Sequence, residues 1–168
     1  MTDFGRRPPV AAPNVLLKTG QTTTYRTGDD GYYEKGWEDG DRFTDNGDGT
    51  ITDNATNLMW PKDWTGLGGN SGNKLNWNGC IDYAEALDFA GNDDWRLPNA
   101  IESPSLMNFS LSNPALGAPF TNVPSDFFHT SSTYIGDIAL AWVMHSWTGR
   151  VFASPKINTR RLICCRDA

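Results

Sequence analysis

Long apolar runs, catalytic motifs and metal-binding motifs are absent from this sequence. No run approaches the ~20 apolar residues that span a bilayer, so we expect no insertion into a membrane. The cysteines show no CxxC spacing, and the two histidines, His129 and His145, fall in no HExxH or HxH pattern, which argues against zinc. GxSxG and GxxxxGK motifs are also missing. Because no residues form a set of nucleophile, base and orienting partner, we expect no enzymatic activity and no cofactor.

Charge is scarce and unevenly distributed. The formal net charge is -6, and this acidity argues against nucleic-acid binding, which needs a broad basic footprint. Acidic residues crowd the segment 29–53 and are absent from 138–166. The cations of the second segment are Arg150, Lys156, Arg160, Arg161 and Arg166. These cations either attract an anionic ligand or pair with the acidic half of the same chain.

The length and composition indicate one loop-rich domain. A chain of 168 residues fits a single domain that buries roughly 70% of its unfolded surface. Its 7 tryptophans predict a core filled by large aromatic side chains. We expect an extended arm or linker over 1–19 and the folded domain over 20–168. The first nine residues lack the apolar core of a signal peptide, as in a chain whose signal was removed or a viral structural protein made without one.

A tight turn near residue 47 predicts a hairpin. The run Asn46-Gly47-Asp48-Gly49 lies between β-forming residues, and Asn and Gly tolerate the positive φ of such turns. A calcium loop is the weaker interpretation, because Gly47 and Gly49 stand where such a loop carries oxygen ligands, so we expect no metal. Further short strands are expected over 21–26, 58–60, 139–144, 150–153 and 160–166.

Two helices are expected between these strands. Asn76 is a suitable cap for the first, which ends at Gly91. Its single apolar stripe consists of Trp77, Cys80, Ile81, Ala84 and Leu87. The second helix is expected to begin at Pro104, capped by the preceding serine. An earlier start, with a capping box of Asn99 and Glu102, would place Pro104 inside the helix and is disfavoured. The order of elements indicates an α+β domain.

Several ordered blocks resemble the C-terminal domain family of bacterial collagen-like adhesins, the Lcl C-terminal domain. The main blocks are RFTDNGDGT at 42–50, LMW at 58–60 and DWRLPN at 94–99. With shorter matches on either side, the resemblance covers roughly residues 20 to 167. It implies a C-type-lectin-like fold with two helices, a small twisted antiparallel sheet and long loops. It also implies binding of glycans, proteins or cell surfaces.

The odd number of cysteines leaves two possibilities open: one disulfide with a free thiol, or three reduced buried cysteines. The resemblance implies a disulfide between Cys80 and Cys164, since family members carry cysteines on the first helix and the last strand. Such a bond constrains the unfolded chain by roughly 4–5 kcal/mol in the entropic model. Cys165 departs from the family, where this position is usually aliphatic. Strand alternation places it on the opposite face from Cys164.

The C-terminal third predicts a ligand-binding surface. Frame residues such as Ala141 and Gly149 match the family, whereas the residues between them differ. This pattern is similar to variable proteins of diversity-generating retroelements, which randomise exposed residues at this end of the fold; ordinary drift is the alternative. The expected ligand contacts are Tyr134, Asp137, Leu140, His145, Trp147, Arg150, Ser154, Lys156, Asn158 and Arg160. Trp142 and Phe152 are expected to face the core.

Two functions therefore compete. The first is receptor recognition by a binding protein on a virion tail or cell surface, with a protein or glycan receptor as partner. The second is adhesion to sulfated glycans through Arg150, Lys156, Arg160 and Arg161. Binding through these cations falls steeply with salt, whereas docking of a protein responds weakly. The resemblance also allows an oligomer, because collagen-like adhesins are commonly trimers.

Overall fold

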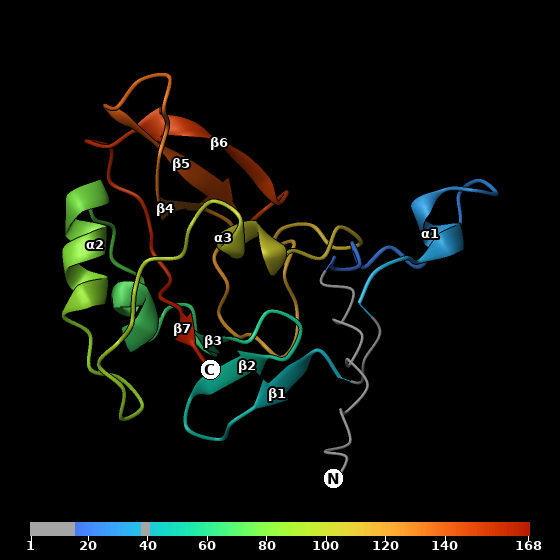
Figure 1. Ribbon diagram of the computed structural model, residues 1–168, viewed down its shortest axis with the longest axis horizontal. Coiled ribbons are helices and arrows are strands. Elements are labelled where there is room, and N and C mark those ends of the chain that lie inside the picture. Colours follow the sequence, from blue (N-terminus) through green and yellow to red (C-terminus); the bar gives the residue numbers. More distant parts are fainter. Residues whose placement is uncertain (1–15, 38–40) are drawn as a thin grey trace, which may run out of the picture.

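The computed structural model describes residues 16–37 and 41–168, which form an α+β domain with two antiparallel sheets (Figure 1). The first sheet has the order β1 (Phe43–Asp45), β2 (Thr50–Asp53), β3 (Leu58–Pro61) and β7 (Arg166–Asp167). The second has the order β4 (Phe127–Thr133), β5 (Leu140–His145) and β6 (Arg150–Pro155). The described helices are α1 (Asp30–Tyr33), the 3-10 helix η1 (Leu67–Gly72), α2 (Trp77–Glu85) and α3 (Glu102–Ser105). The α+β class is confirmed, but two sheets and 4 short helices replace one sheet and two helices.

The hairpin of β1 and β2 forms where its turn residues predict it. Asp45 accepts a hydrogen bond from the Gly47 N–H (3.1 Å), and Asp48 accepts one from the Thr50 N–H (2.9 Å). Asp45 also pairs with Lys62 at 2.5 Å. Gly47 has a φ of 80°, a conformation that a side chain would strain. Both carboxylates therefore accept hydrogen bonds within the turn, and the predicted hairpin is confirmed.

Helix α2 begins at the predicted cap and ends early. The Asn76 side chain accepts a hydrogen bond from the Gly79 N–H at 2.9 Å, as an N-cap does. The helix ends at Glu85 rather than at Gly91. Its buried residues, Cys80 and Ala84, belong to the predicted apolar stripe. The stripe therefore identified the buried face correctly, while the end of the helix was placed too late.

Helix α3 begins earlier than expected. Asn99 accepts hydrogen bonds from the N–H groups of Ile101 and Glu102, and the Glu102 carboxylate accepts one from the Asn99 N–H. This arrangement is the capping box, so the start at Pro104 was wrong. Pro104 is tolerated because it is the third residue of the helix, where the backbone N–H that proline lacks would have no partner within the helix.

Two expected strands are wrong or incomplete. Residues 21–26 form loop and turn that lead into α1. The segment 160–166 makes only isolated bridges, pairing Arg160 with Leu75 and Cys165 with Arg96, before β7 begins at Arg166. It passes between the two sheets (Figure 1), where residues 162–165 are all fully buried. Because it meets a different neighbour at each step, no ladder of hydrogen bonds develops.

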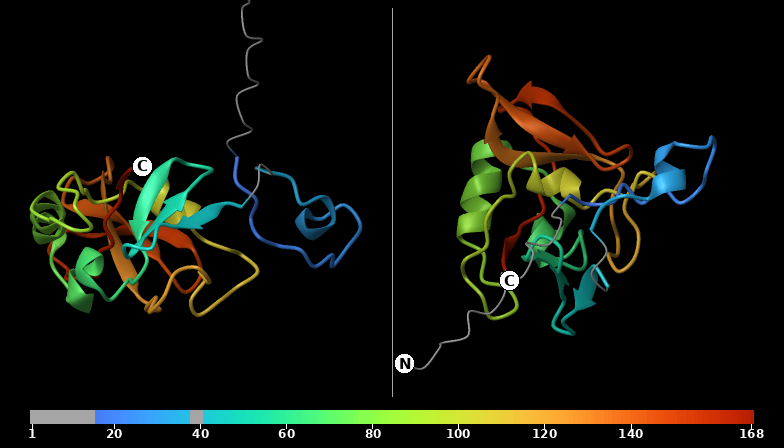
Figure 2. Two further views of the ribbon diagram at one scale, coloured as in Figure 1. Left: turned by 90° about the horizontal axis from the view of Figure 1, so that it is seen from below. Right: turned by 45° about the vertical axis from the view of Figure 1, so that its right-hand side comes forward.

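The N-terminal part of the described chain projects from one side of the domain (Figures 1 and 2). Of the expected arm over 1–19, residues 1–15 lie outside the described residues. Leu16 accepts a hydrogen bond from the Trp37 N–H (2.7 Å), and Thr19 accepts one from the Phe109 N–H (2.7 Å). The first bond joins the two ends of the projecting segment, which includes α1, and the second ties this segment to the rest of the chain. None of the described helices is long and apolar enough to span a bilayer.

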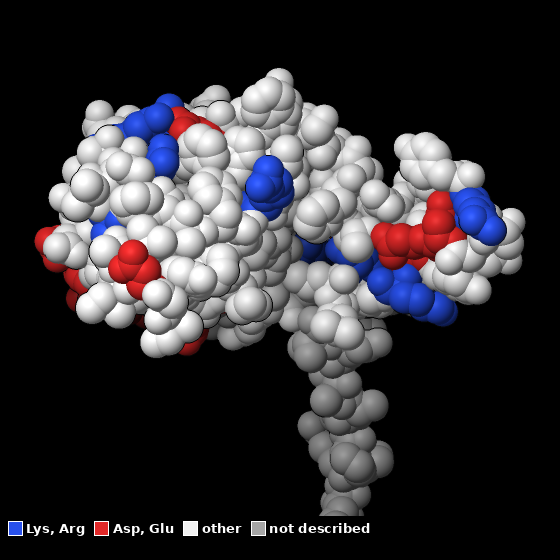
Figure 3. Space-filling model, turned by 90° about the horizontal axis from the view of Figure 1, so that it is seen from above, with Lys and Arg blue, Asp and Glu red and all other residues white. Residues whose placement is uncertain are grey.

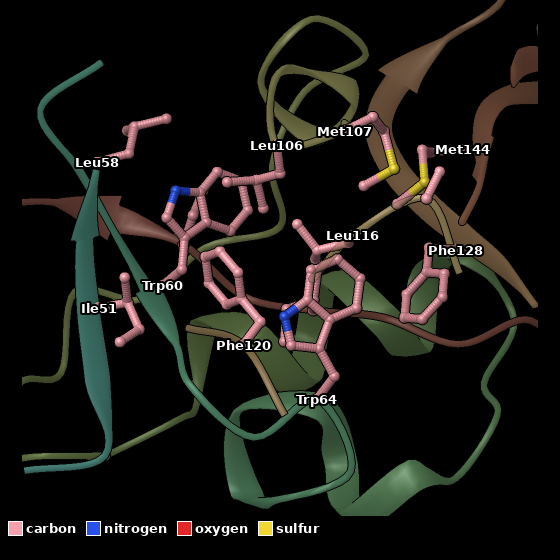
Figure 4. Close-up of a cluster of buried hydrophobic side chains, with 13 residues drawn as sticks. Ile51, Leu58, Trp60, Trp64, Leu106, Met107, Leu116, Phe120, Phe128 and Met144 are labelled. Atoms are coloured by element: carbon pink, nitrogen blue, oxygen red, sulfur yellow. The ribbon is translucent and has the colours of Figure 1, made fainter. Parts of the chain in front are cut away.

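Aromatic side chains fill the larger of two hydrophobic clusters (Figure 4). Trp64 meets Phe128 edge-on at 5.0 Å and Phe120 at 6.2 Å between ring centroids. Trp60 is also fully buried in this cluster. The second cluster packs α2 against Trp95 and the segment that leads to β7. Large aromatic side chains in the core are therefore confirmed.

All three cysteines are free and buried, in contrast to the expected disulfide between Cys80 and Cys164. Cys80 and Cys164 lie in the same hydrophobic cluster, and Cys165 lies in the other. The opposite orientation of Cys164 and Cys165 is therefore confirmed. Reduced thiols pack here as small apolar side chains. Formation of the Cys80–Cys164 bond under oxidising conditions stays a prediction.

The native protein is expected to resist alkylation. Burial raises the pKa of the Cys80 and Cys165 thiols to about 12, and it raises the pKa of Cys164 as well. Because the thiolate is the reacting form, iodoacetamide should modify these cysteines roughly a thousandfold more slowly than an ordinary thiol. Mass spectrometry with and without denaturant checks this. A fast native reaction would contradict the burial, and a single reactive thiol after unfolding would show that the disulfide had formed.

Candidate ligand-binding site

At the end of the β4–β5–β6 sheet where Phe127 pairs with His145, the two faces of the sheet differ in burial. Phe128 pairs with Met144 across β4 and β5, and Phe127 pairs with His145. Successive strand residues point to opposite faces. Phe128 and Met144 are fully buried in the core (Figure 4), so their face is the inner one. We call the opposite face, which carries Phe127 and His145, the outer face. Farther along β5, Val143 and Ala141 lie on this same face and are fully buried.

Aromatic and cationic side chains meet on the outer face. The Phe127 ring stacks on the His145 imidazole with centroids 4.5 Å apart, and it meets Phe152 edge-on at 5.5 Å. The Arg160 guanidinium lies 4.8 Å from the Phe127 centroid. Trp147 lies 6.0 Å from His145 and is 48% exposed. We call these five residues the aromatic–arginine cluster.

The segment that follows β6 crosses back over the sheet, and we call residues 156–161 the strap. The Arg161 N–H donates to the Phe127 carbonyl at 3.0 Å, and the His129 N–H donates to the Arg161 carbonyl at 2.9 Å. The strap therefore pairs with the edge of β4 through its backbone. This pairing brings residues far apart in sequence onto one surface.

Four predicted contact residues lie on or under the strap. Asn158 and Arg160 both donate to the Ser154 hydroxyl, at 3.4 and 3.3 Å. Lys156 lies 3.8 Å from the centre of the Trp77 ring. Ser154 is buried, whereas the three strap side chains are half-buried. The predicted strap residues thus border the cluster, with Lys156 turned toward α2.

The predicted residues Tyr134, Asp137 and Leu140 lie at the tip of the β4–β5 hairpin. The Tyr134 N–H donates to Leu140 O (3.0 Å), and the Leu140 N–H donates to Asp137 O (2.9 Å). Tyr134 packs edge-on against Trp142, which belongs to the inner face. The structure therefore separates these three residues from the aromatic–arginine cluster.

The ten predicted residues thus form two groups, one around the cluster and strap and one at the hairpin tip. The structure adds Phe127 and Phe152 to the first group. His145, Trp147 and Arg160 belong to the cluster, and Arg150 pairs with His145 across the strands. Phe127 was missed because no strand was predicted over 127–133. Phe152 was expected to face the core, but it lies half-buried on the outer face. The two adjacent phenylalanines at 127–128 were the sequence signal that could have identified this strand.

Two C-terminal cations are neutralised, but by partners outside the acidic segment 29–53. Arg161 pairs with Asp126 at 2.9 Å, and Arg166 pairs with Asp94 at 2.5 Å. The remaining three, Arg150, Lys156 and Arg160, form no ion pair within the described residues. The side of the molecule seen in Figure 3 is largely uncharged, with scattered Lys and Arg side chains and several Asp and Glu side chains. Electrostatic attraction at this surface therefore rests on few cations.

A separate cleft of about 860 Å³ lies between the projecting N-terminal segment and the loop after α3. Leu17, Phe43 and Leu116 are among its apolar lining residues. Arg42 also lines it, but this guanidinium is engaged by Asp53 and the Ser105 carbonyl. None of the ten predicted contact residues lines this cleft.

At one end of the sheet, aromatic and cationic side chains lie together beside the strap, an arrangement that surface-binding domains also use. The family model described as the Lcl C-terminal domain matches residues 49–166, and the chain belongs to this family. The match contains both groups of predicted contact residues but not α1. Membership in this adhesin-type family suggests a binding or adhesion role at an extracellular surface. No curated protein matches the chain.

Proposed function

We propose that the chain recognises a protein or glycan receptor through the outer face of the β4–β5–β6 sheet and catalyses no reaction. The observation that carries this proposal is the aromatic–arginine cluster. Tryptophan and arginine are the residue types that most often dominate binding energy, and here Trp147 and Arg160 flank the same stacked rings. The strands hold these side chains on a rigid support, which limits the entropy lost on binding.

The proposal includes a variant C-type-lectin fold whose C-terminal residues vary between related copies. The burial pattern supports it, because frame residues and contact residues differ physically. Ala141 is fully buried, and a side chain at Gly149 would meet Phe109 and Met107 at 3.0 and 3.3 Å. Trp147 and Arg150, in contrast, are exposed. Such a surface changes without disturbing the core, as receptor recognition by a virion or cell-surface protein requires.

The DNA that flanks the coding region tests this variation. We expect a near-copy of the segment that encodes residues 129–166, differing mainly at adenines, beside a reverse transcriptase gene. A copy of this kind would mark the diversified positions directly. Sequencing that finds no such copy would contradict diversification and leave a fixed adhesin surface.

Binding should depend on Trp147 and Arg160. Labelled protein is applied to an array of neutral and sulfated glycans and to intact bacterial and epithelial cells. Replacing either residue by alanine should weaken binding to the positive probe by about 30-fold or more, as for interface hot spots. Tyr25→Ala, which alters an exposed side chain on the projecting segment, is the matched control. Unchanged binding by both Trp147→Ala and Arg160→Ala would place the site elsewhere.

Adhesion to sulfated glycans is the second candidate. It is favoured by the three cations that lack a carboxylate partner in the described part of the chain, Arg150, Lys156 and Arg160. Its signature is a steep loss of binding to sulfated glycans as salt rises, because exposed charges are screened. Salt-independent binding, lost in Trp147→Ala, would instead favour docking through the aromatic rings.

A further inference from the structure

His129 joins β4 to the strap at two points. Its backbone N–H donates to the Arg161 carbonyl at 2.9 Å, and its Nε2 lies 3.0 Å from the Asn158 carbonyl. A carbonyl oxygen only accepts hydrogen bonds, which assigns the imidazole proton to Nε2. The neutral ring therefore holds the strap by donating to Asn158, and Nδ1 carries a lone pair.

The far side of the imidazole is unsuited to a second proton. His129 is fully buried, and its Nδ1 has no hydrogen-bond partner within the described residues. The Arg160 Nε is also buried and unpartnered. Protonation at Nδ1 would create a buried imidazolium with an unsatisfied donor, near a second cation.

The charges around the ring all oppose protonation. Burial lowers the pKa of His129, the hydrogen bond to Asn158 partly offsets this, and the Arg160 charge lowers the pKa further. Of the other two strap cations, Arg161 is bound to Asp126 and to a carbonyl oxygen, and Lys156 lies over the Trp77 ring.

Among the other elements packed around β4, β5 brings one titratable group, His145, which stacks on Phe127, and the remaining neighbours of His129 are neutral. From β5, Val143 lies opposite His129. From β6, Ser154 contacts the strap, and from α2 the Trp77 indole donates to the next β4 residue, Thr130. None of these described neighbours carries a carboxylate that could stabilise an imidazolium. Protonation of His129 is therefore not compensated by a nearby negative charge.

We propose that His129 is a pH-sensitive latch that holds the strap on the outer face at neutral pH and releases it in acid. Release removes Asn158 and Arg160 from Ser154 and from the Phe127 ring. The ordinary imidazole pKa is about 6.5, so the released state gains protons as the pH falls below that value while the latched state does not. If the proposed function holds, acid thereby weakens the receptor-binding surface.

Hydrogen exchange of the strap tests the latch without any ligand. Between about pH 7.5 and about pH 5, the opening equilibrium of peptides over 156–161 should rise by up to about 30-fold after correction for intrinsic exchange. His129→Gln should abolish this rise, because a glutamine amide can donate to Asn158 and stays neutral. His145→Gln is the matched control, because it removes the other of the chain's two histidines and should keep the rise.

A pH-independent wild type, or an equal rise in His129→Gln, would overturn the latch. Should His129→Gln fail to fold, nuclear magnetic resonance of the wild type decides: the strap amides must titrate with the midpoint of the His129 imidazole, and a different midpoint overturns the proposal. The latch rests on the proposed function only for its effect on binding. Receptor binding that is independent of Trp147 would therefore contradict the proposed recognition site. It would not change the interpretation of the hydrogen-exchange result.

Discussion

Replacing Asp53 by alanine is expected to lower the free energy of unfolding by about 3–5 kcal/mol. Asp53 is fully buried and accepts hydrogen bonds from Arg42 Nε at 3.1 Å and Nη2 at 2.8 Å. The Arg42 side chain is only 20% exposed and also donates to the Ser105 carbonyl at 2.7 Å. Removing the carboxylate leaves this cation partly buried without its counter-charge. Urea denaturation followed by circular dichroism measures the loss.

Asp45→Ala is the matched control for this prediction. Asp45 pairs with Lys62 at the surface, where the two side chains are 42% and 36% exposed. Solvent weakens such a pair, so we expect Asp45→Ala to lose clearly less stability than Asp53→Ala. Equal losses for the two variants would show that burial does not determine the strength of the Arg42–Asp53 pair.

Elements set by local chemistry were predictable from the sequence. The turn at Asn46–Gly49 and the Asn76 cap depend on residues within one turn of each other, and both are confirmed. The start of α3 was missed because two local signals, the capping box and the proline, favoured different first residues. The capping box of Asn99 and Glu102 is compatible with the proline, because Pro104 lies in the first turn, where no N–H is needed for a bond within the helix.

Elements set by distant partners were not predictable. Strand β4 contains a run of histidine, threonine and serine, and its register shifts between His129 and Thr133. Its polar groups are satisfied from afar: Thr130 Oγ1 donates to the Trp142 carbonyl, and the Thr130 carbonyl accepts from Trp77. Periodicity within the segment carries no sign of these partners, so the strand and its Phe127 were missed.

The candidate site was predicted in part for the same reason. Trp147 was identified as a surface residue because it stands beside a turn, and it is exposed. Arg160 was chosen for its charge, but its place over Phe127 depends on the strap folding back across β4. Tyr134 and Leu140 were grouped with the site by proximity in sequence, whereas their hydrogen bond closes a hairpin tip away from the cluster.

Trp64→Ala and Trp147→Ala make the same chemical change, the first in the core and the second at the surface. Trp64 is 1% exposed and packs edge-on against Phe120 and Phe128, so its truncation should cost about 3–5 kcal/mol of stability. Trp147 is half-exposed, and its truncation should cost no more than about 1 kcal/mol. Thermal and urea unfolding of both variants measures the difference.

Trp64→Phe separates ring packing from the indole N–H. The Trp64 N–H is buried without a partner, so phenylalanine keeps most ring contacts and removes an unsatisfied donor. We therefore expect Trp64→Phe to lose clearly less stability than Trp64→Ala. If Trp147→Ala proved as destabilising as Trp64→Ala, the aromatic–arginine cluster would be part of the folding core. A stable Trp147→Ala that has lost receptor binding is the combination that a recognition surface on an independent core requires.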